Sequence, residues 1–573
     1  MRFARNRLFV LALSLLGILP AILAPAARPS VVMAAPAATA PVSDAELSTR
    51  LDAFLTSLFP ADKPGAVVLV ARDGKAVYRK GFGMADMGTR TPLAPESVLR
   101  IGSITKQFTS AAILRLEESG KLKVTDPIDK WLPDFPLQGH TVTIENLLTH
   151  TSGIKGYTEV PEWAARMNED LSHEQVIDFI KNEPFLFEPG TSWSYSNSGY
   201  FLLGMIIEKA SGMPYRAYLE QEIFKPLGMT RTGYGDRNPT FPGEARGYAM
   251  EGDKVVPAQP LSMSSPYAAG ALVSSVDDLL KWDNALASDR LLHPKSSKAM
   301  WTPFKQVSGK TSGYGYGWLM GEYEGHPIQE HNGGINGFTC HAMRMPEDHV
   351  YVVVLTNSDS PPVDPGYLAL MMAAEAIGKP MPQPGDFIIA PEKLDEFTGV
   401  YAVDSTSTRT IIREGDHLVS QRKGGARLAL YPANDSTFAF QGRPARITFG
   451  RNASGKIDHL TLHQGGYAEV ARLTDAPLPA QRTVMELPAA ALAAYVGEYQ
   501  LAPGFTLTVT QEGSALKAQA TGQPAVEIYP ESETRFFLKV VDAQIDFTKG
   551  ADGRMASLTL HQGGQQIPAA RIK

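Results

Sequence analysis

The chain has 573 residues, of which 43% are hydrophobic and 20% are charged, and its formal net charge is −6 at pH 7. This length exceeds what one hydrophobic core supports, so we expect about three domains of an ordinary globular protein. The charge is mild, and no basic run or stripe interleaved with aromatic residues occurs, which argues against nucleic acid as a partner.

The amino terminus has the pattern of an export signal. Arg2, Arg5 and Arg7 precede an apolar stretch at 8–24, and small residues at 32–34 resemble a cleavage site. An uncleaved anchor is the alternative, because this stretch approaches the lower length limit for a spanning helix. The Ala/Pro-rich tract that follows favours cleavage. We therefore predict a signal peptide at 1–34, export to the periplasm or the extracellular space, and no stable membrane span afterwards.

Cysteine and histidine usage bears on disulfides and metals. Cys340 is the only cysteine, so no intrachain disulfide can form, and its apolar strand-like surroundings favour a buried structural thiol over a nucleophile. No His-Glu-x-x-His arrangement occurs among the histidines, and His459 with His463 is at best a loose pair. We predict neither a metal nor a cofactor.

From residue 43 the sequence predicts an α/β unit. Ser43 and Glu46 resemble a capping box that begins an amphipathic helix. Strands near both ends of the unit, with helices between them, predict one sheet joined from the two ends plus a mostly helical insert, and a cleft between them is the default place for a site. The expected elements are strands at 67–71, 76–80, 338–345 and 349–355 and helices at 43–58, 108–116, 200–210 and 367–377.

Beyond a Pro/Gly-rich linker at 378–386 the chain repeats itself. The segment Leu460–Gly466 recurs as Leu558–Gly564, an offset of 98 residues (558 minus 460). Two copies with so long a period indicate a duplicated domain rather than a solenoid, and their short alternating strands are typical of a small antiparallel barrel or sandwich. We expect a domain at 43–380, a first repeat at 388–474 and a second repeat at 488–573.

The main catalytic candidates lie before the apolar run at 108–116. Gly102 marks a turn, so Ser103 would begin a helix and Lys106 would follow one turn later on the same face. A serine at a helix start has free backbone N–H groups beside it that can hold an oxyanion. Two further Ser-x-x-Lys segments lie in strand-like sequence, where the two side chains would point to opposite faces. We predict Ser103 as a nucleophile and Lys106 as its activating partner.

Two further motifs provide companions for Ser103. In Tyr195-x-Asn197 an extended backbone would point phenol and amide the same way, although a core tyrosine beside a helix-capping asparagine is the simpler interpretation of this motif alone. In His331-x-Gly333-Gly334 the glycines would let backbone N–H groups approach a substrate closely. The His-x-Gly pattern also occurs twice in the repeats, so by itself it is a weak signal.

Together the three motifs resemble, in order and rough spacing, those of the serine β-lactamases and penicillin-recognising hydrolases. The tyrosine version is similar to class C β-lactamases, D-aminopeptidases and CubicO-type esterases. The resemblance covers residues 45–380 and implies a β-lactamase-like α/β sandwich, an antiparallel sheet with an all-helical subdomain. The tail resembles the lipocalin-like eight-stranded barrels appended to some D-aminopeptidases.

This resemblance also implies roles for the candidate residues. The N–H groups of Ser103 and Gly334 would hold the oxyanion, and Asn197 would orient Lys106 and the substrate amide. The base stays open between two alternatives. Lys106 could accept the serine proton if its pKa fell about 3 pH units below the usual 10.4, or it could stay charged and stabilise a Tyr195 phenolate that acts as base.

The third motif bears on the substrate. The β-lactamases and carboxypeptidases that the chain resembles carry a lysine where His331 stands, and that lysine supplies a fixed charge for the substrate carboxylate. A histidine is only about a quarter charged at pH 7. We therefore expect an exported serine hydrolase of small molecules or peptides, a D-aminopeptidase-like peptidase or a carboxylesterase in preference to a β-lactamase or DD-carboxypeptidase. A binding or regulatory protein of the same fold, without turnover, is the alternative; the oligomeric state stays open.

Overall fold

The computed structural model describes residues 42–573 apart from 253, 289, 384, 405–406, 424, 444, 465–466, 480–481, 503–504, 522, 524, 552 and 563–564. The predicted signal peptide at 1–34 lies outside the described residues. Among those that are described, no helix combines the length and the apolar character needed to cross a membrane. The chain divides into one unit that extends to Met250 and continues over Val255–Met381, and a second that comprises Glu251–Lys254 and Pro382–Lys573.

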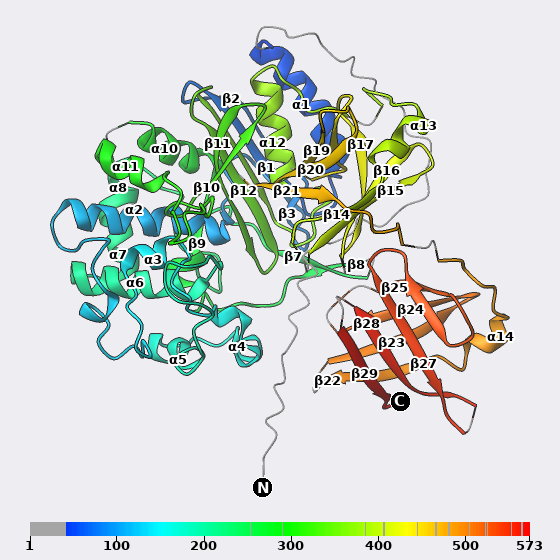
Figure 1. The fold of residues 1–573 in the computed structure, drawn as a ribbon. Coiled ribbons are helices and arrows are strands. Elements are labelled where there is room, and N and C mark those ends of the chain that lie inside the picture. Colours follow the sequence, from blue (N-terminus) through cyan, green and yellow to red (C-terminus); the bar gives the residue numbers. More distant parts are fainter. Residues whose placement is uncertain are drawn as a thin grey trace. The chain divides into compact units, whose positions relative to one another are not determined.

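A six-stranded antiparallel sheet with the order β10-β11-β12-β13-β1-β2 forms the centre of the first unit (Figure 1). Strand β1 pairs with β13 along its whole length, so strands from the two ends of the unit meet as the sequence predicts. The strands are β1 (Ala66–Arg72), β2 (Lys75–Phe82), β10 (Leu319–Tyr323), β11 (His326–Ile335), β12 (Phe338–Met345) and β13 (Val350–Thr356).

The two faces of this sheet pack against different helices. Val68 and Val70 of β1 share a core with α1 (Asp44–Leu58) and α12 (Pro365–Ala376), whereas Val67 and Leu69 face the helical region. Because side chains alternate along a strand and both faces are covered, β1 is apolar almost throughout. Helix α1 begins as predicted, with the Ser43 side chain accepting a hydrogen bond from the Glu46 N–H.

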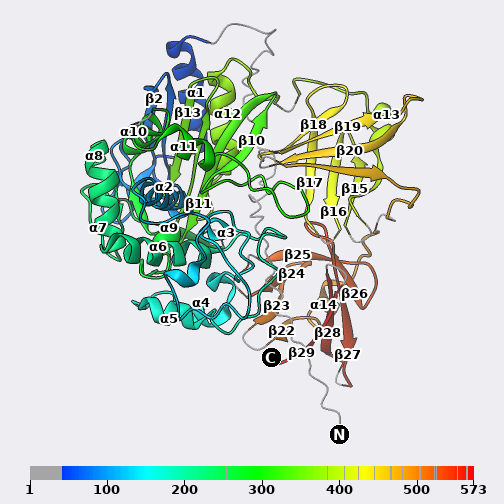
Figure 2. The same cartoon turned by 60° about the vertical axis from the view of Figure 1, so that its left-hand side comes forward.

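The helical region lies on the other side of the sheet (Figure 2). Its longest helices are α2 (Thr105–Glu118), α6 (Asn197–Ser211) and α10 (Val276–Leu286), and α2 packs against α6 and α9. The shorter helices are α3 (Ile144–Leu148), α4 (Pro161–Arg166), α5 (His173–Asp178), α7 (Tyr215–Leu219), α8 (Lys225–Leu227), α9 (Tyr267–Gly270) and α11 (Pro294–Met300). The short strands are β3 (Met84–Asp86), β4 (Thr91–Pro92), β5 (Leu99–Arg100), β6 (Gly233–Tyr234), β7 (Tyr248–Glu251), β8 (Lys254–Pro257) and β9 (Leu272–Ser274).

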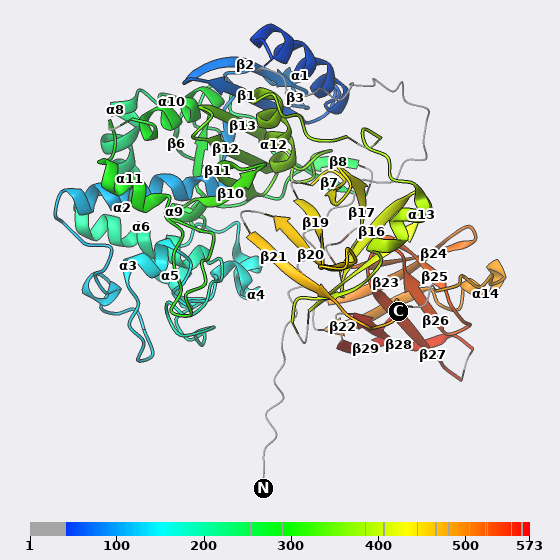
Figure 3. The ribbon, with the colours of Figure 1, turned by 45° about the horizontal axis from the view of Figure 1, so that its top comes forward.

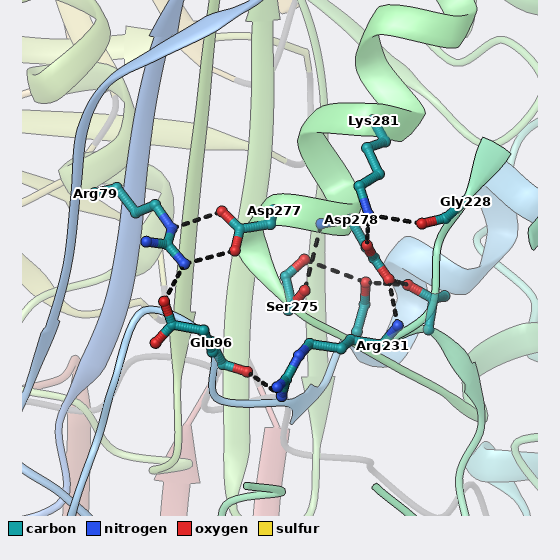
Figure 4. A network of polar contacts seen from close by, with 10 residues as sticks. Arg79, Glu96, Gly228, Arg231, Ser275, Asp277, Asp278 and Lys281 are labelled. Atoms are coloured by element: carbon teal, nitrogen blue, oxygen red, sulfur yellow. Dashed lines mark hydrogen bonds and ion pairs between the residues drawn. The ribbon is translucent and has the colours of Figure 1, made fainter. Parts of the chain in front are cut away.

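A polar network connects β2, the start of α10 and the loop before β6 (Figure 4). The carboxylate of Asp278 is 1% exposed and accepts hydrogen bonds from the Arg231 N–H at 2.6 Å and the Lys281 Nζ at 2.7 Å. Beside it, Arg79 of β2 donates to both oxygens of Asp277 at 2.6 and 2.7 Å. A buried carboxylate is costly unless donors surround it, so Asp278 fixes the loop on the helix.

The second unit contains two closed eight-stranded barrels, β14 to β21 and β22 to β29 (Figure 3). Each follows a short helix, α13 (Pro391–Leu394) or α14 (Ala489–Leu492). The repeat is also structural, because the Tyr401 hydroxyl donates to the Phe397 carbonyl and the Tyr499 hydroxyl donates to the Tyr495 carbonyl, both at 2.8 Å. The predicted fold class, an α/β unit followed by two small barrels, is confirmed.

The first barrel consists of β14 (Gly399–Ala402), β15 (Thr408–Glu414), β16 (His417–Arg422), β17 (Arg427–Pro432), β18 (Thr437–Phe440), β19 (Ala445–Arg451), β20 (Ile457–Gln464) and β21 (Tyr467–Leu473). The second consists of β22 (Gly497–Ala502), β23 (Phe505–Glu512), β24 (Ala515–Ala520), β25 (Val526–Pro530), β26 (Arg535–Leu538), β27 (Ala543–Lys549), β28 (Met555–Gln562) and β29 (Gln565–Arg571). In both barrels each strand pairs with the next, and the last strand pairs with the first.

Candidate active site

Ser103 lies in a 3-10 turn (Gly102–Ile104) that leads directly into α2. Gly102 has a φ of +49°, and a Cβ at this position would lie 3.0 Å from the backbone nitrogen of Gly334. Glycine therefore permits both the left-handed backbone and the close approach of β11. Ser103 is partly exposed, while its two neighbours are buried.

The amine of Lys106 is enclosed and has three polar partners. Its Nζ lies 3.1 Å from the Ser103 Oγ, 2.9 Å from the Asn197 Oδ1 and 2.8 Å from the Ala269 carbonyl oxygen. The residue is 0% exposed, and burial lowers the pKa of Lys106 well below its ordinary value. A neutral amine has two N–H donors and one lone pair, so it can donate to Asn197 and Ala269 while it accepts the hydroxyl proton of Ser103.

The phenol of Tyr195 belongs to the same group of side chains. Ser103 is close enough to influence the pKa of the Tyr195 phenol, and the Lys106 Nζ lies 4.7 Å from the centre of the Tyr195 ring. Burial raises the pKa of Tyr195, so the phenol keeps its proton. Between the two alternatives for the base, these opposite shifts favour a neutral Lys106 over a Tyr195 phenolate.

His150 accepts hydrogen bonds from the backbone on either side of Tyr195, a role that sequence reasoning did not find. The Ser194 N–H donates to the His150 carbonyl at 3.0 Å, and the Ser196 N–H donates to the His150 Nδ1 at 3.1 Å. The rings of His150 and Tyr195 lie 4.3 Å apart. His150 is 1% exposed, and burial lowers its pKa well below the ordinary value, so the ring is neutral. The available signal was the sequence Leu147–Gly153 around it, which also resembles the serine β-lactamase-related proteins.

His331 lies near Tyr195, with 6.2 Å between the ring centres, but it carries no charge into the site. Its Nδ1 donates to the Asn332 carbonyl at 2.6 Å, and its Nε2 accepts from the Tyr314 hydroxyl at 2.9 Å. The side chain is 1% exposed, and burial lowers the pKa of His331 to about 3. The expectation of a histidine that is a quarter charged at pH 7 was therefore wrong, because desolvation keeps the ring neutral.

The two glycines after His331 play different parts. A Cβ on Gly333 would lie 2.1 Å from the Ile101 carbonyl oxygen and 2.5 Å from the Cys340 sulfur, so Gly333 lets β11 pack on the segment before Ser103. Gly334 is exposed and has open space where a side chain would be, which leaves room for a substrate. Cys340 is buried and its thiol donates to the Ile101 carbonyl, in agreement with a structural thiol.

Six of the seven predicted site residues, Ser103, Lys106, Tyr195, Asn197, Gly334 and His331, thus gather where the start of α2, the start of α6 and strand β11 meet, and Gly333 provides the close packing. Within the described part of the chain, no group of three or more His, Cys, Asp or Glu residues could hold a metal ion. The site thus places a serine hydroxyl beside a buried amine with a lowered pKa and near a phenol with a raised pKa.

Comparisons with known proteins agree with this arrangement. Residues 55–376 match the Beta-lactamase family, and residues 481–570 match a domain of unknown function, DUF3471. Penicillin-binding protein 4* of Bacillus subtilis (strain 168) is 27% identical over 523 residues, which are 88% of this chain and 94% of that protein. Protein flp of Staphylococcus aureus (strain N315) is 29% identical over 307 residues, 52% of this chain and 60% of that protein.

Among solved structures, the octameric penicillin-binding protein homologue from Pyrococcus abyssi is similar to this chain with a TM-score of 0.54 and 27% identity. The similarity covers 75% of this chain and 100% of that one.

Proposed function

Because this chain belongs to the β-lactamase family, whose members are typically serine hydrolases, we propose that it cleaves an amide or ester through an acyl-enzyme on Ser103. The observation that carries this proposal is the enclosed amine of Lys106, 3.1 Å from the Ser103 hydroxyl and with a lowered pKa. An uncharged amine beside a partly exposed hydroxyl is the arrangement that activates a serine nucleophile.

The proposed reaction begins when Lys106 accepts the hydroxyl proton as the Ser103 Oγ attacks the substrate carbonyl. The N–H groups of Ser103 and Gly334 would hold the oxyanion of the tetrahedral intermediate. Tyr195, which stays protonated, would donate its proton to the leaving group as the acyl-enzyme forms. Water would then attack the ester with the proton transfers reversed. Asn197 would hold the amine of Lys106 in place.

The neutral ring of His331 guides the proposed substrate class. A β-lactam or a peptide with a free C-terminus carries a carboxylate beside the reacting carbonyl, and an uncharged His331 offers it no countercharge. We therefore favour substrates without that carboxylate beside the reacting carbonyl, such as amides of D-amino acids, peptides cleaved at their amino-terminal residue away from the C-terminus, or esters. The predicted signal peptide would direct this activity outside the cytoplasm.

A fluorophosphonate probe tests the nucleophile, since it labels activated serines covalently. We expect labelling of the wild type and none of Ser103→Ala. Ser119→Ala is the matched control, because Ser119 caps the far end of the same helix and bonds the Leu116 carbonyl; this variant should label normally. Labelling that survives Ser103→Ala would refute the nucleophile.

A substrate panel tests the class. It contains D- and L-alanine p-nitroanilides, p-nitrophenyl acetate and a chromogenic cephalosporin. We expect hydrolysis of an amino-acid anilide or the ester to exceed that of the cephalosporin at least about 100-fold, the effect of one lost charged hydrogen bond of about 3 kcal/mol. Preferential cleavage of the cephalosporin would contradict the role given to His331. Labelling without turnover of any substrate would instead point to the binding-protein alternative.

A further inference from the structure

The two barrels share one strand framework but differ in the interior side chains at one end. In the first barrel Arg409 pairs with Arg422 across β15 and β16, and Ile411 pairs with Ser420. Ile411 is buried, and side chains two apart on a strand share a face, so Arg409 also faces the barrel interior. This places a guanidinium among the interior side chains, at the end remote from α13.

The guanidinium of Arg409 has a neutral partner. Its Nη1 donates to the Ser420 Oγ at 2.8 Å, and Ser420 is 0% exposed. Its Cζ lies 6.0 Å from the centre of the Phe440 ring. Among the described residues Arg409 forms no ion pair with a carboxylate, although an arginine has five N–H donors in a planar fork. Burial lowers the pKa of Arg409, while the nearby carboxylate of Glu469 raises it without forming an ion pair and the guanidinium of Arg422 lowers it.

The second barrel shows that the fold does not need these polar groups. At the positions 98 residues later, the pair Arg409–Arg422 becomes Leu507–Ala520, and Ser420 becomes Ala518. Leu507 and Ala518 are buried in the apolar core of the second barrel. The same framework thus closes with apolar side chains, and the polar groups of the first barrel need another explanation.

The rim of this end sets the charge that a ligand would meet. Arg422 and Glu469 are both exposed. Glu469 pairs with the inward-facing Leu462, so Glu469 lies on the inner face of the barrel. The corresponding residue of the second barrel is Ile567. The side chains of Arg409, Arg422 and Glu469 together carry one net positive charge. A monoanion matches that charge, whereas Glu469 would repel a dianion such as phosphate.

We propose that this end of the first barrel binds the carboxylate of a small organic acid, held by the guanidinium of Arg409 and the hydroxyl of Ser420. The planar fork of Arg409 matches the two oxygens of a carboxylate, and Ser420 can donate its O–H to the same group while it accepts from Arg409. Phe440 gives the acid an apolar neighbour. The proposed ligand groups all come from the first barrel, beside the loop that the second barrel contacts through the Asp542 N–H and the Gly425 carbonyl, and the site does not depend on the function proposed for Ser103.

Calorimetric titration of the purified full chain with hexanoate and with hexanamide tests this site at low ionic strength. We expect hexanoate to bind at least about 10-fold more tightly than its neutral analogue, as a charge-assisted bidentate contact requires. Arg409→Leu and Ser420→Ala introduce residues of the kind that the second barrel carries there, so the framework should accept them. Arg409→Leu should abolish the preference and Ser420→Ala should weaken it.

Two further variants sharpen the result. Glu469→Gln removes the repelling carboxylate and should tighten hexanoate binding a few-fold. Arg413→Gln is the matched control, because Arg413 lies at the other end of the same strand, pairs with Asp395 and corresponds to Gln511 in the second barrel; it should leave the preference intact. Equal binding of hexanoate and hexanamide by the wild type, or a preference that survives in folded Arg409→Leu, would overturn the proposal.

Discussion

The amine of Lys106 is the group on which the proposed activation of Ser103 depends. Its three partners match the two donors and one lone pair of an uncharged amine. A lysine with a lowered pKa has a larger neutral fraction at any given pH, and only the neutral form can accept the proton of Ser103. Activity should therefore rise with pH through the pKa of Lys106 and fall as the amine becomes protonated at lower pH.

Asn197→Asp tests this assignment. The new carboxylate would lie 2.9 Å from the Nζ and favour the charged amine, so the pKa of Lys106 rises. We expect the acid limb of the kcat/KM profile to move to higher pH by about 1 to 3 pH units. Asn197→Ala is the control, because it removes the same hydrogen bond without adding charge and should lower the rate without an upward shift. A limb that stays in place with Asn197→Asp would exclude Lys106 as the titrating base.

His150→Phe tests the support of Tyr195. The substitution keeps a ring but removes the acceptor of the Ser196 N–H, which leaves a buried donor unpaired at a cost of about 1 to 3 kcal/mol. We expect kcat to fall about 5- to 100-fold with little change in KM, since Tyr195 acts on the leaving group. His150→Asn, which can again accept from Ser196, should restore part of kcat. Equal losses in both variants would indicate general destabilisation instead.

At the scale of elements, the site exists because three of them converge: the turn before α2, the extended segment that enters α6, and strand β11. Glycine makes two of the contacts possible, Gly102 against Gly334 and Gly333 against Ile101. Elsewhere in the first unit, the Figure 4 network holds α10 and the loop before β6 on β2.

Asp278→Ala should destabilise the first unit by about 2 to 4 kcal/mol, because Arg231 and Thr232 lose a buried charged acceptor. The urea midpoint for loss of hydrolytic activity measures this effect. Asp277→Ala provides the comparison, since Asp277 is about a third exposed and its pair with Arg79 is worth about 1 kcal/mol or less. A larger effect from Asp277→Ala than from Asp278→Ala would contradict the importance given to burial.

At the scale of the whole molecule, each part has its own hydrophobic core. The two cores that flank the sheet draw their residues from the first unit, and each barrel has a separate core. We therefore expect residues 35–381 alone to fold, to unfold cooperatively and to hydrolyse a p-nitrophenyl ester within about 10-fold of the full chain. Circular dichroism and ester hydrolysis measure both properties. An aggregated or unfolded fragment would show that the barrels are needed for folding.

The sequence by itself determined the elements and the repeat. Local periodicity and turn residues predicted the hairpin of β1 and β2 and the helix after Ser103. The recurrence of the same sequence 98 residues later predicted the two barrels. The motifs at Ser103, Tyr195 and His331 likewise identified the residues that gather at the site.

Only the tertiary structure decided the pKa shifts of the site residues and the contacts that hold them in place. Burial lowers the pKa of Lys106 and that of His331, which overturned the expectation of a partly charged His331 and favours Lys106 over Tyr195 as the base. His150 contacts the backbone next to Tyr195, although the two residues are 45 positions apart in the sequence (195 minus 150). The folded barrels likewise show that Arg409 and Leu507 occupy equivalent inward-facing positions. A pKa and a buried contact depend on groups that become neighbours upon folding, so a local pattern cannot specify them.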